Sequence, residues 1–439
     1  MTKKITIAVL TLFIFQFSYS QTIDKAKLDS YFQSLETNNK FMGSVALSQN
    51  GKLLYTKSIG YADIESKTKP DENSKYRIGS ISKTFTTVLI LKAVEEKKLD
   101  LNQTIDKYFP AIKNAKKITI TQLLYHRSGI HNFTDDENYL QWNTQKKTEK
   151  EMVGIIAKAG SDFTPDSISA YSNSNFVLLS YILTNNYKKS YADLLNEKIV
   201  KPLGLKNTFF GDKINVTNNE CNSYKFLTDW TKETETDMSI PMGAGGVVST
   251  PVDLTKFADG LFGEKLISKN SLSQMITLKD HFGMGLFQIP FYDKKGYGHT
   301  GGIDGFSSVF SYFPDDKIAY ALTSNGTNYD NNKISLAVLS IAYNKPFQIP
   351  DFTSIAVSPA ELDTYVGVYS SSEMPLKITI TKNENVLMAQ ATGQPAFKLE
   401  PTAKHTFQFE AAGLVLVFMP ETKQMTLKQG GGVYTFIKE

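Results

Sequence analysis

Two strand-forming regions of this chain lie far apart in the sequence. Residues 43–48 and 52–58 are β-prone and flank Asn50-Gly51, and Asn-Gly is the strongest short signal for a hairpin turn. Residues 306–313 and 318–324 also alternate and are rich in aromatic and β-branched side chains. The stretch between the two regions has mainly helical apolar spacing. We therefore predict an α+β fold, in which distant strands close one antiparallel sheet around a helical insertion.

The chain of 439 residues is too long for one ordinary domain. Residues 346–359 contain several prolines without periodicity and are predicted to be a linker between a domain at 21–345 and a second one at 360–439. The second domain is predicted to be a small all-β barrel, because short strands follow one another closely. Its candidate strands are residues 376–381, 386–391, 397–399, 406–409, 414–418, 425–427 and 433–437.

The N-terminus has the pattern of a signal peptide. Two lysines precede an apolar run at residues 5–17, and Ser18 and Ser20 fit a small-x-small cleavage site. We predict that residues 1–20 are removed and that the protein is exported to a bacterial periplasm or secreted. The apolar run is short for a membrane span, so no stable membrane insertion is expected after cleavage, and an uncleaved anchor is the alternative.

Composition excludes some classes of function. The formal net charge is +4 and no basic stripe is present, which argues against a nucleic-acid-binding surface. Cys221 is the only cysteine, so no intrachain disulfide can form. His131, His281 and His405 have no metal-ligand partners at useful spacing, and we predict neither a metal nor another cofactor. The oligomeric state is left open by the sequence.

A Gly-Ser pair at residues 79–80 leads into an apolar run at 85–94 that is predicted to be a buried helix. Lys83 would lie one helical turn from the Ser80 hydroxyl. A desolvated lysine can accept the proton of a serine, and the N–H groups of a helix N-terminus can hold an oxyanion. Ser66-Lys67-Thr68-Lys69 has the same spacing, but it lies in a polar stretch that is predicted to be a loop.

Two further stretches carry suitable partners. In Tyr171-Ser172-Asn173 the tyrosine can act as a base or proton shuttle beside a lysine, and the amide of the asparagine can hold a lysine or a substrate carbonyl. In His299-Thr300-Gly301-Gly302, strand alternation places His299 and Gly301 on one face, and the two glycines would let a substrate backbone approach closely.

Taken in order, these three stretches resemble the Ser-x-x-Lys, Tyr-x-Asn and (Lys/His)-Thr-Gly signature of the penicillin-recognising serine hydrolases. The similarity is to the branch that holds class C β-lactamases, DD-peptidases, D-aminopeptidases and related esterases. Residues 123–129, 202–208 and 245–250 are also similar to motifs of that branch, and the resemblance covers roughly residues 25–345. The C-terminal part more loosely resembles a lipocalin-like β-domain. The resemblance implies a β-lactamase/transpeptidase-like fold.

The resemblance also implies roles for individual residues. The implied catalytic residues are Ser80 as the acylated nucleophile, Lys83 as its activating partner and Tyr171 as a proton shuttle. The implied substrate-binding residues are Asn173, His299, Thr300 and Gly301. The implied oxyanion hole is formed by the backbone N–H groups of Ser80 and Gly302. Whether Lys83 or Tyr171 is the acylation base stays open.

Class C β-lactamases have lysine where this chain has His299. Histidine is a weaker, pH-dependent cation, which favours a peptidase or an esterase over a β-lactamase. The prediction is an exported serine hydrolase that cleaves an amide or ester through an acyl-enzyme on Ser80, with a small peptide, ester or β-lactam-like substrate. The alternatives are a true β-lactamase and a non-catalytic sensor or binding protein.

Overall fold

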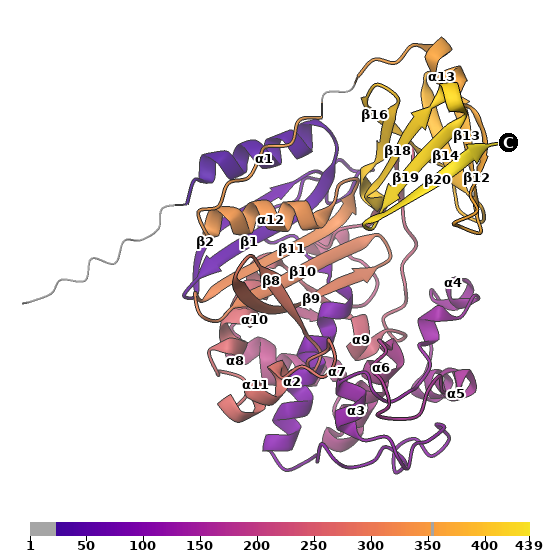
Figure 1. Ribbon diagram of the computed structural model, residues 1–439. Coiled ribbons are helices and arrows are strands. Elements are labelled where there is room, and N and C mark those ends of the chain that lie inside the picture. The colour runs from indigo at the N-terminus through magenta and orange to yellow at the C-terminus, as the bar shows by residue number, and fades with distance from the viewer. Residues whose placement is uncertain (1–22, 353–354) are drawn as a thin grey trace, which may run out of the picture.

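The computed structural model describes residues 23–352 and 355–439 (Figure 1). The predicted signal peptide lies outside this part of the chain. Across the described residues, no helix is both long enough and apolar enough to span a bilayer. We refer to residues 23–352 as the sheet lobe and to residues 359–439 as the barrel.

A six-stranded antiparallel sheet with the order β2-β1-β11-β10-β9-β8 organises the sheet lobe. Its strands are β1 (Phe41–Gln49), β2 (Lys52–Ile59), β8 (Phe287–Phe291), β9 (Lys294–Ile303), β10 (Phe306–Phe313) and β11 (Ile318–Thr327). The N-terminal hairpin β1–β2 joins the later strands through the β1–β11 pair, from Phe41 opposite Thr327 to Gln49 opposite Ile318. The predicted long-range closure of the sheet is therefore confirmed. Strand β8 and the first residues of β9 (294–297) were not predicted from the sequence.

Helices cover both faces of this sheet (Figure 1). On one face, α1 (Lys25–Thr37) and α12 (Asn331–Ala342) share an apolar core with the strands. On the other face, α10 (Pro251–Phe262) packs on β1, β10 and β11, and the helical insertion lies beyond it. Because both faces are covered, β1 is buried along nearly its whole length.

Helix α2 (Ser82–Glu95) runs through the centre of the helical insertion. Its side chains are buried on nearly every side, as expected for a helix that is apolar all round. It packs against α6 (Asn173–Tyr187) and α9 (Met242–Gly245). The predicted helix at residues 85–94 is confirmed, and it begins earlier, after the turn η1 (Gly79–Ile81).

The remaining elements of the sheet lobe are short or peripheral. The helices are α3 (Ile120–Leu124), α4 (Tyr139–Trp142), α5 (Glu149–Ala159), α7 (Tyr191–Leu195), α8 (Lys201–Leu203) and α11 (Lys269–Ile276). The strands are β3 (Tyr76–Arg77), β4 (Phe209–Phe210), β5 (Tyr224–Phe226), β6 (Trp230–Lys232) and β7 (Val247–Ser249). The single turns are η2 (Phe133–Asp135), η3 (Asn196–Val200) and η4 (Val216–Asn218).

The barrel is a nine-stranded antiparallel sheet with the order β15-β14-β13-β12-β20-β19-β18-β17-β16. Its edge strands β15 (Phe397–Lys398) and β16 (Glu400–Ala403) follow one another around Leu399, so the chain itself closes the sheet into a nearly complete barrel. The predicted barrel is confirmed. The other strands are β12 (Gly367–Ser370), β13 (Lys377–Asn383), β14 (Val386–Ala391), β17 (Thr406–Phe409), β18 (Leu414–Met419), β19 (Gln424–Gln429) and β20 (Gly432–Lys438).

Two elements at the start of the barrel were not predicted, helix α13 (Pro359–Tyr365) and strand β12. The prolines before residue 360 pointed to a linker, yet a helix start signal is present there. The Ser358 side chain accepts a hydrogen bond from the Glu361 N–H, and Pro359 occupies the first turn, where proline is tolerated.

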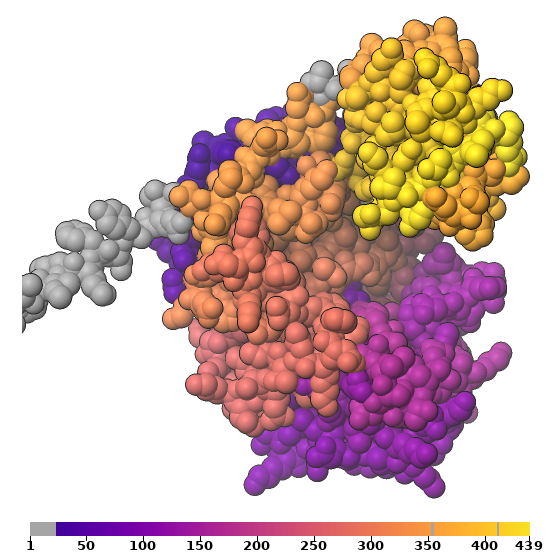
Figure 2. Space-filling model, in the orientation of Figure 1, coloured from indigo at the N-terminus to yellow at the C-terminus, as the bar shows by residue number. Residues whose placement is uncertain are grey.

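Polar contacts join the barrel to the sheet lobe, and Figure 2 shows the barrel (yellow) as a distinct lobe at the upper right of the molecule. Lys40 forms a 2.5 Å ion pair with Glu400, and Lys333 forms one with Glu410. The backbone N–H of Lys398 donates to the carbonyl oxygen of Leu227 at 3.3 Å.

Candidate active site

Ser80 and Lys83 meet at the start of α2, as their spacing predicted. The Lys83 amine is fully buried, and its Nζ lies 2.9 Å from Ser80 Oγ. It also donates to Asn173 Oδ1 at 2.7 Å and to the Ala244 carbonyl oxygen at 2.8 Å. None of these hydrogen-bond partners is a carboxylate, and burial lowers the pKa of Lys83 well below its ordinary value. The surroundings therefore favour a neutral amine beside the serine hydroxyl.

The ring of Tyr171 also lies next to the Lys83 amine. The Lys83 Nζ is 4.9 Å from the centroid of the Tyr171 ring. Burial raises the pKa of Tyr171 to about 12, and a hydrogen bond with Ser80 opposes this shift in part. At neutral pH the phenol therefore keeps its proton and can donate a hydrogen bond.

The structure places His126 in the core against Tyr171. The two rings stack with centroids 4.6 Å apart, and His126 Nδ1 accepts the Ser172 N–H at 3.1 Å. Burial lowers the pKa of His126 well below its usual range, which keeps the ring neutral. His126 thus holds the segment that carries Tyr171. The motif around residues 123–129 was the available signal for this contact.

Asn173, the first residue of α6, has both ends of its amide engaged. Its Oδ1 accepts from Lys83, and its Nδ2 donates to Thr134 Oγ1 at 3.1 Å. The backbone N–H of Asn173 donates to Asn132 Oδ1 at 2.9 Å. The predicted contact between this amide and the lysine is therefore present.

His299 lies on β9 near Lys83, but it is not the cation that the sequence suggested. Burial, followed by the nearby Lys83, lowers the pKa of His299 to about 3, so the ring is neutral. Its Nδ1 contacts the Thr300 carbonyl oxygen and must donate to it, because a carbonyl only accepts. The Phe287 ring, with its centroid 4.5 Å away, helps to exclude water from this histidine.

The residues after His299 also differ from expectation. Thr300 is exposed and does not line the cleft next to Ser80. A Cβ at Gly301 would lie 2.0 Å from the Ile78 carbonyl oxygen, so the missing side chain makes room for the chain before Ser80 rather than for a substrate. Gly302 does line the cleft, and its backbone N lies 2.8 Å from the position that a Cβ at Gly79 would take. Gly79 has a φ of +49°, which favours glycine there.

The cleft has a volume of about 270 Å³ and contains Ser80, Asn173 and Gly302 in its lining. Its outer wall includes Leu140 of α4, which is 80% exposed, and the charged pair Lys225 and Glu233. Among the described residues, no cluster of three or more potential metal ligands occurs.

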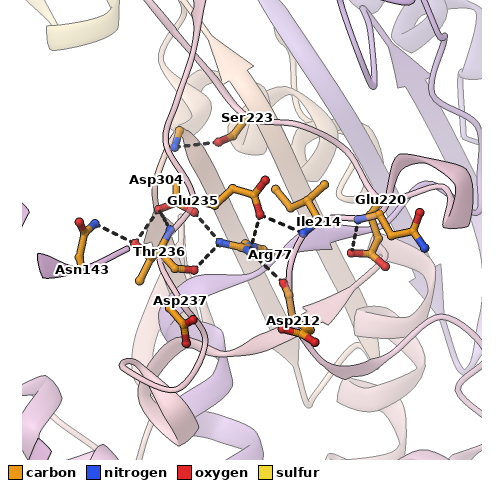
Figure 3. Close-up of polar contacts among 12 residues, drawn as sticks. Arg77, Asn143, Asp212, Ile214, Glu220, Ser223, Glu235, Thr236, Asp237 and Asp304 are labelled. Carbon is orange, nitrogen blue, oxygen red and sulfur yellow. Dashed lines mark hydrogen bonds and ion pairs between the residues drawn. The ribbon is translucent and has the colours of Figure 1, made fainter. Parts of the chain in front are cut away.

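A buried ion-pair network supports one side of this cleft (Figure 3). Arg77 pairs with Asp304 at 2.8 Å and with Glu235 at 3.3 Å, and both Arg77 and Asp304 are almost fully buried. Asp304 also accepts the backbone N–H and the hydroxyl of Thr236 at 3.0 and 2.7 Å. The network therefore joins two segments: the turn with Asp304, which comes just after Gly302, and the segment with Arg77, which comes just before α2. Sequence reasoning missed it, because none of these charges stands in a local pattern.

A family model described as Beta-lactamase matches residues 28–342. This chain belongs to the beta-lactamase family. The family resemblance and the predicted enzyme class are thereby confirmed, and the protein is a serine hydrolase.

A penicillin-binding protein of Bacillus subtilis (strain 168) is 26% identical to this chain over 425 residues. The match covers 89% of this chain and 93% of the relative. A teichoic acid D-alanine hydrolase of Staphylococcus aureus is 29% identical over 339 residues, or 73% of this chain and 79% of the relative.

Two solved structures are similar. A D-amino acid amidase from Ochrobactrum anthropi SV3, complexed with D-phenylalanine, has a TM-score of 0.63 and 25% identity, covering 73% of this chain and 99% of its own. An octameric penicillin-binding protein homologue from Pyrococcus abyssi has a TM-score of 0.66 and covers 95% of this chain and 100% of its own. At 21% identity the latter shows the fold alone, and it shows it for nearly the whole chain.

Proposed function

We propose that this enzyme hydrolyses ester or amide bonds of D-aminoacyl compounds that have a free amino group, through an acyl-enzyme on Ser80. The observation that carries the proposal is the buried Lys83 amine, whose Nζ lies 2.9 Å from Ser80 Oγ. No carboxylate among its hydrogen-bond partners stabilises the charged form of this amine. A neutral amine at hydrogen-bonding distance is what a serine hydroxyl needs in order to lose its proton.

In the proposed reaction, Ser80 Oγ attacks the substrate carbonyl carbon while its proton passes to Lys83 Nζ. The backbone N–H groups of Ser80 and Gly302 would hold the oxyanion, and the close approach of Gly79 to Gly302 supports this role. Tyr171, which keeps its proton at neutral pH, would protonate the leaving alcohol or amine as the bond to it breaks. Tyr171 would then be reprotonated from Lys83. Water releases the acid from Ser80 by the same steps in reverse.

The choice of substrate class is supported by His299. A neutral, buried histidine supplies no positive charge for the terminal carboxylate of a peptide. The exposed cation of the cleft wall, Lys225, is already paired with Glu233 at 3.0 Å. A substrate with a free ammonium group and no carboxylate suits this cleft better. The names of the amidase and of the D-alanine hydrolase among the similar proteins point to the same class.

We also propose that the enzyme acts after export. This part of the proposal rests on the signal-peptide pattern of residues 1–20. N-terminal sequencing of the protein recovered from the culture medium or the cell envelope should begin at Gln21. A full-length protein that stays in the cytosolic fraction would contradict it.

The acyl-enzyme is tested by mass spectrometry after incubation with a fluorophosphonate. The parent protein and Ser66→Ala should gain one adduct, which peptide mapping places on Ser80, and Ser80→Ala should gain none. Ser66 is a matched control, because it has the same spacing to a lysine but lies in a turn, where its hydroxyl contacts Asp63. An adduct that persists in Ser80→Ala would exclude Ser80 as the nucleophile.

The substrate class is tested with a small panel: D-alanine and L-alanine amides and methyl esters, an acyl-D-Ala-D-Ala peptide and a chromogenic cephalosporin. We expect hydrolysis of the D-alanine ester or amide, with N-acetylation of the substrate reducing kcat/KM. Faster turnover of the acyl-D-Ala-D-Ala peptide would favour a DD-peptidase, and faster turnover of the cephalosporin would favour a β-lactamase.

A further inference from the structure

A small hairpin formed by β5 and β6 bridges the sheet lobe and the barrel. Its base is firmly held by the sheet lobe. Asn325 Nδ2 donates to the Asn222 carbonyl oxygen at 2.8 Å, and the buried Tyr224 donates its hydroxyl to Asp63 at 2.9 Å. The Gly305 N–H donates to Ser223 Oγ at 3.2 Å, which connects the hairpin to the turn that follows Gly302.

The tip of the hairpin enters the barrel. Leu227 lines an apolar cavity of about 250 Å³ inside the barrel, together with Phe397, Phe409 and Leu414. The carbonyl oxygen of Leu227 accepts the N–H of Lys398 from the edge strand β15. The Leu227 side chain therefore faces the apolar interior of the barrel, and a backbone hydrogen bond from β15 fastens the tip.

The arms of the same hairpin form part of the active-site cleft. Lys225 on one arm, together with Glu233 and Thr234 after the other, lines the cleft that contains Ser80. The Lys225 ammonium and the Glu233 carboxylate pair at 3.0 Å across the hairpin. A two-stranded hairpin of such short strands is at best marginally stable by itself in water. Its position in the cleft thus depends on what holds its two ends.

We propose that the barrel positions the outer wall of the active-site cleft through Leu227, and that Leu227 is a positioning residue for substrate binding. The inference rests on the proposed function, because its kinetic readout is hydrolysis at Ser80. Leu227 touches neither Ser80 nor Lys83, so its loss should leave the reactivity of the serine intact. It should instead loosen the Lys225–Glu233 wall and weaken the binding of a substrate that contacts this wall.

The test compares Leu227→Ala with Leu227→Met and with Val433→Ala in the full chain. Val433 is a matched control because it is a barrel residue that is 62% exposed and lies outside the cavity lining. We expect Leu227→Ala to raise KM for the D-alanine substrate about tenfold with little change in kcat, which corresponds to a loss of about 1.4 kcal/mol of binding free energy. Leu227→Met should restore the parent KM, and the rate of fluorophosphonate labelling of Ser80 should be the same in all variants.

A second readout does not depend on turnover. The chain has two tryptophans, and in a Trp142→Phe background Trp230 on β6 reports on the hairpin alone. Trp230 donates its Nε1–H to Asn39 at 2.8 Å, and its ring packs on Gly326. Leu227→Ala should shift its emission to longer wavelength and increase quenching by acrylamide, whereas Val433→Ala should not.

Unchanged KM and unchanged Trp230 emission in Leu227→Ala would overturn the inference. Loss of fluorophosphonate labelling in the parent would instead contradict the proposed function, while the fluorescence comparison would still decide the role of Leu227. If Leu227→Ala does not fold, Leu227→Val allows the same comparison, because it removes less of the side chain from the cavity.

Discussion

Replacing Lys83 with methionine should reveal the charge state of the amine beside Ser80. Methionine has similar length and no titratable group, so it fills the buried site and removes the proton acceptor. In the parent, burial holds the pKa of Lys83 well below 10.5. Between this lowered pKa and 10.5, the unfolded chain binds a proton at this lysine and the folded chain does not. The free energy of unfolding of the parent therefore rises with pH throughout that window.

The magnitude follows from proton linkage. A difference of one bound proton changes the free energy of unfolding by about 1.4 kcal/mol per pH unit. From about pH 8 to about pH 9.5, the stability of the parent relative to Lys83→Met should thus rise by about 2 kcal/mol. Other buried groups, such as Tyr171 and Cys221, titrate in both proteins and cancel in the difference.

Urea denaturation at several pH values measures this difference. Lys69→Met is the control, because Lys69 stands three residues after Ser66 but is 55% exposed, and its ion pair with Glu36 should contribute little. Fluorophosphonate labelling of Ser80 should also slow about 10²- to 10⁴-fold in Lys83→Met, which is the usual contribution of a general base. Parallel stability curves for the parent and Lys83→Met would mean that the folded lysine is charged and would refute its role as the base.

Three further predictions concern the residues around this pair. Tyr171→Phe should keep the ring stacking and lower kcat by about 10²- to 10⁴-fold with little effect on KM in steady-state assays, and an unchanged kcat would exclude the tyrosine as proton donor. The pKa of His299 is about 3, so this histidine stays neutral from weakly acidic pH upward. We therefore expect His299→Gln to leave the shape of the pH profile of kcat/KM unaltered between about pH 5 and 8. If the variant lost an ionisation from that profile, the histidine would titrate in this range. Arg77→Met should leave the buried Asp304 carboxylate unpaired and lower the free energy of unfolding by about 3 to 5 kcal/mol in urea titrations, and a loss below about 1 kcal/mol would contradict the importance of this ion pair.

The parts of the fold with strong local periodicity were predictable from the sequence. The hairpin with Asn50-Gly51 at its turn, the apolar helix after Ser80 and the barrel strands all follow from residue spacing. Strand β8 and helix α13 were missed. The prolines of residues 346–359 favoured a linker, but Pro359 lies in the first turn of α13, where proline is tolerated. Strand β8 contains Pro290, which is tolerated because β8 is the edge strand of its sheet.

The sequence alone determined that Lys83 lies one helical turn from Ser80, and its resemblance to the signature of the penicillin-recognising serine hydrolases indicated that Tyr171, Asn173 and His299 lie near the pair. Only the tertiary structure decided how deeply these residues are buried and which of them carry a charge. Lys83 is buried by segments distant in the sequence, such as the one that contains Ala244. His299 is neutral because it is buried beside Phe287. The hairpin that forms part of the cleft wall likewise extends to the barrel, where Leu227 lines the apolar cavity. Desolvation is a sum over all neighbours in space, so no local pattern encodes it.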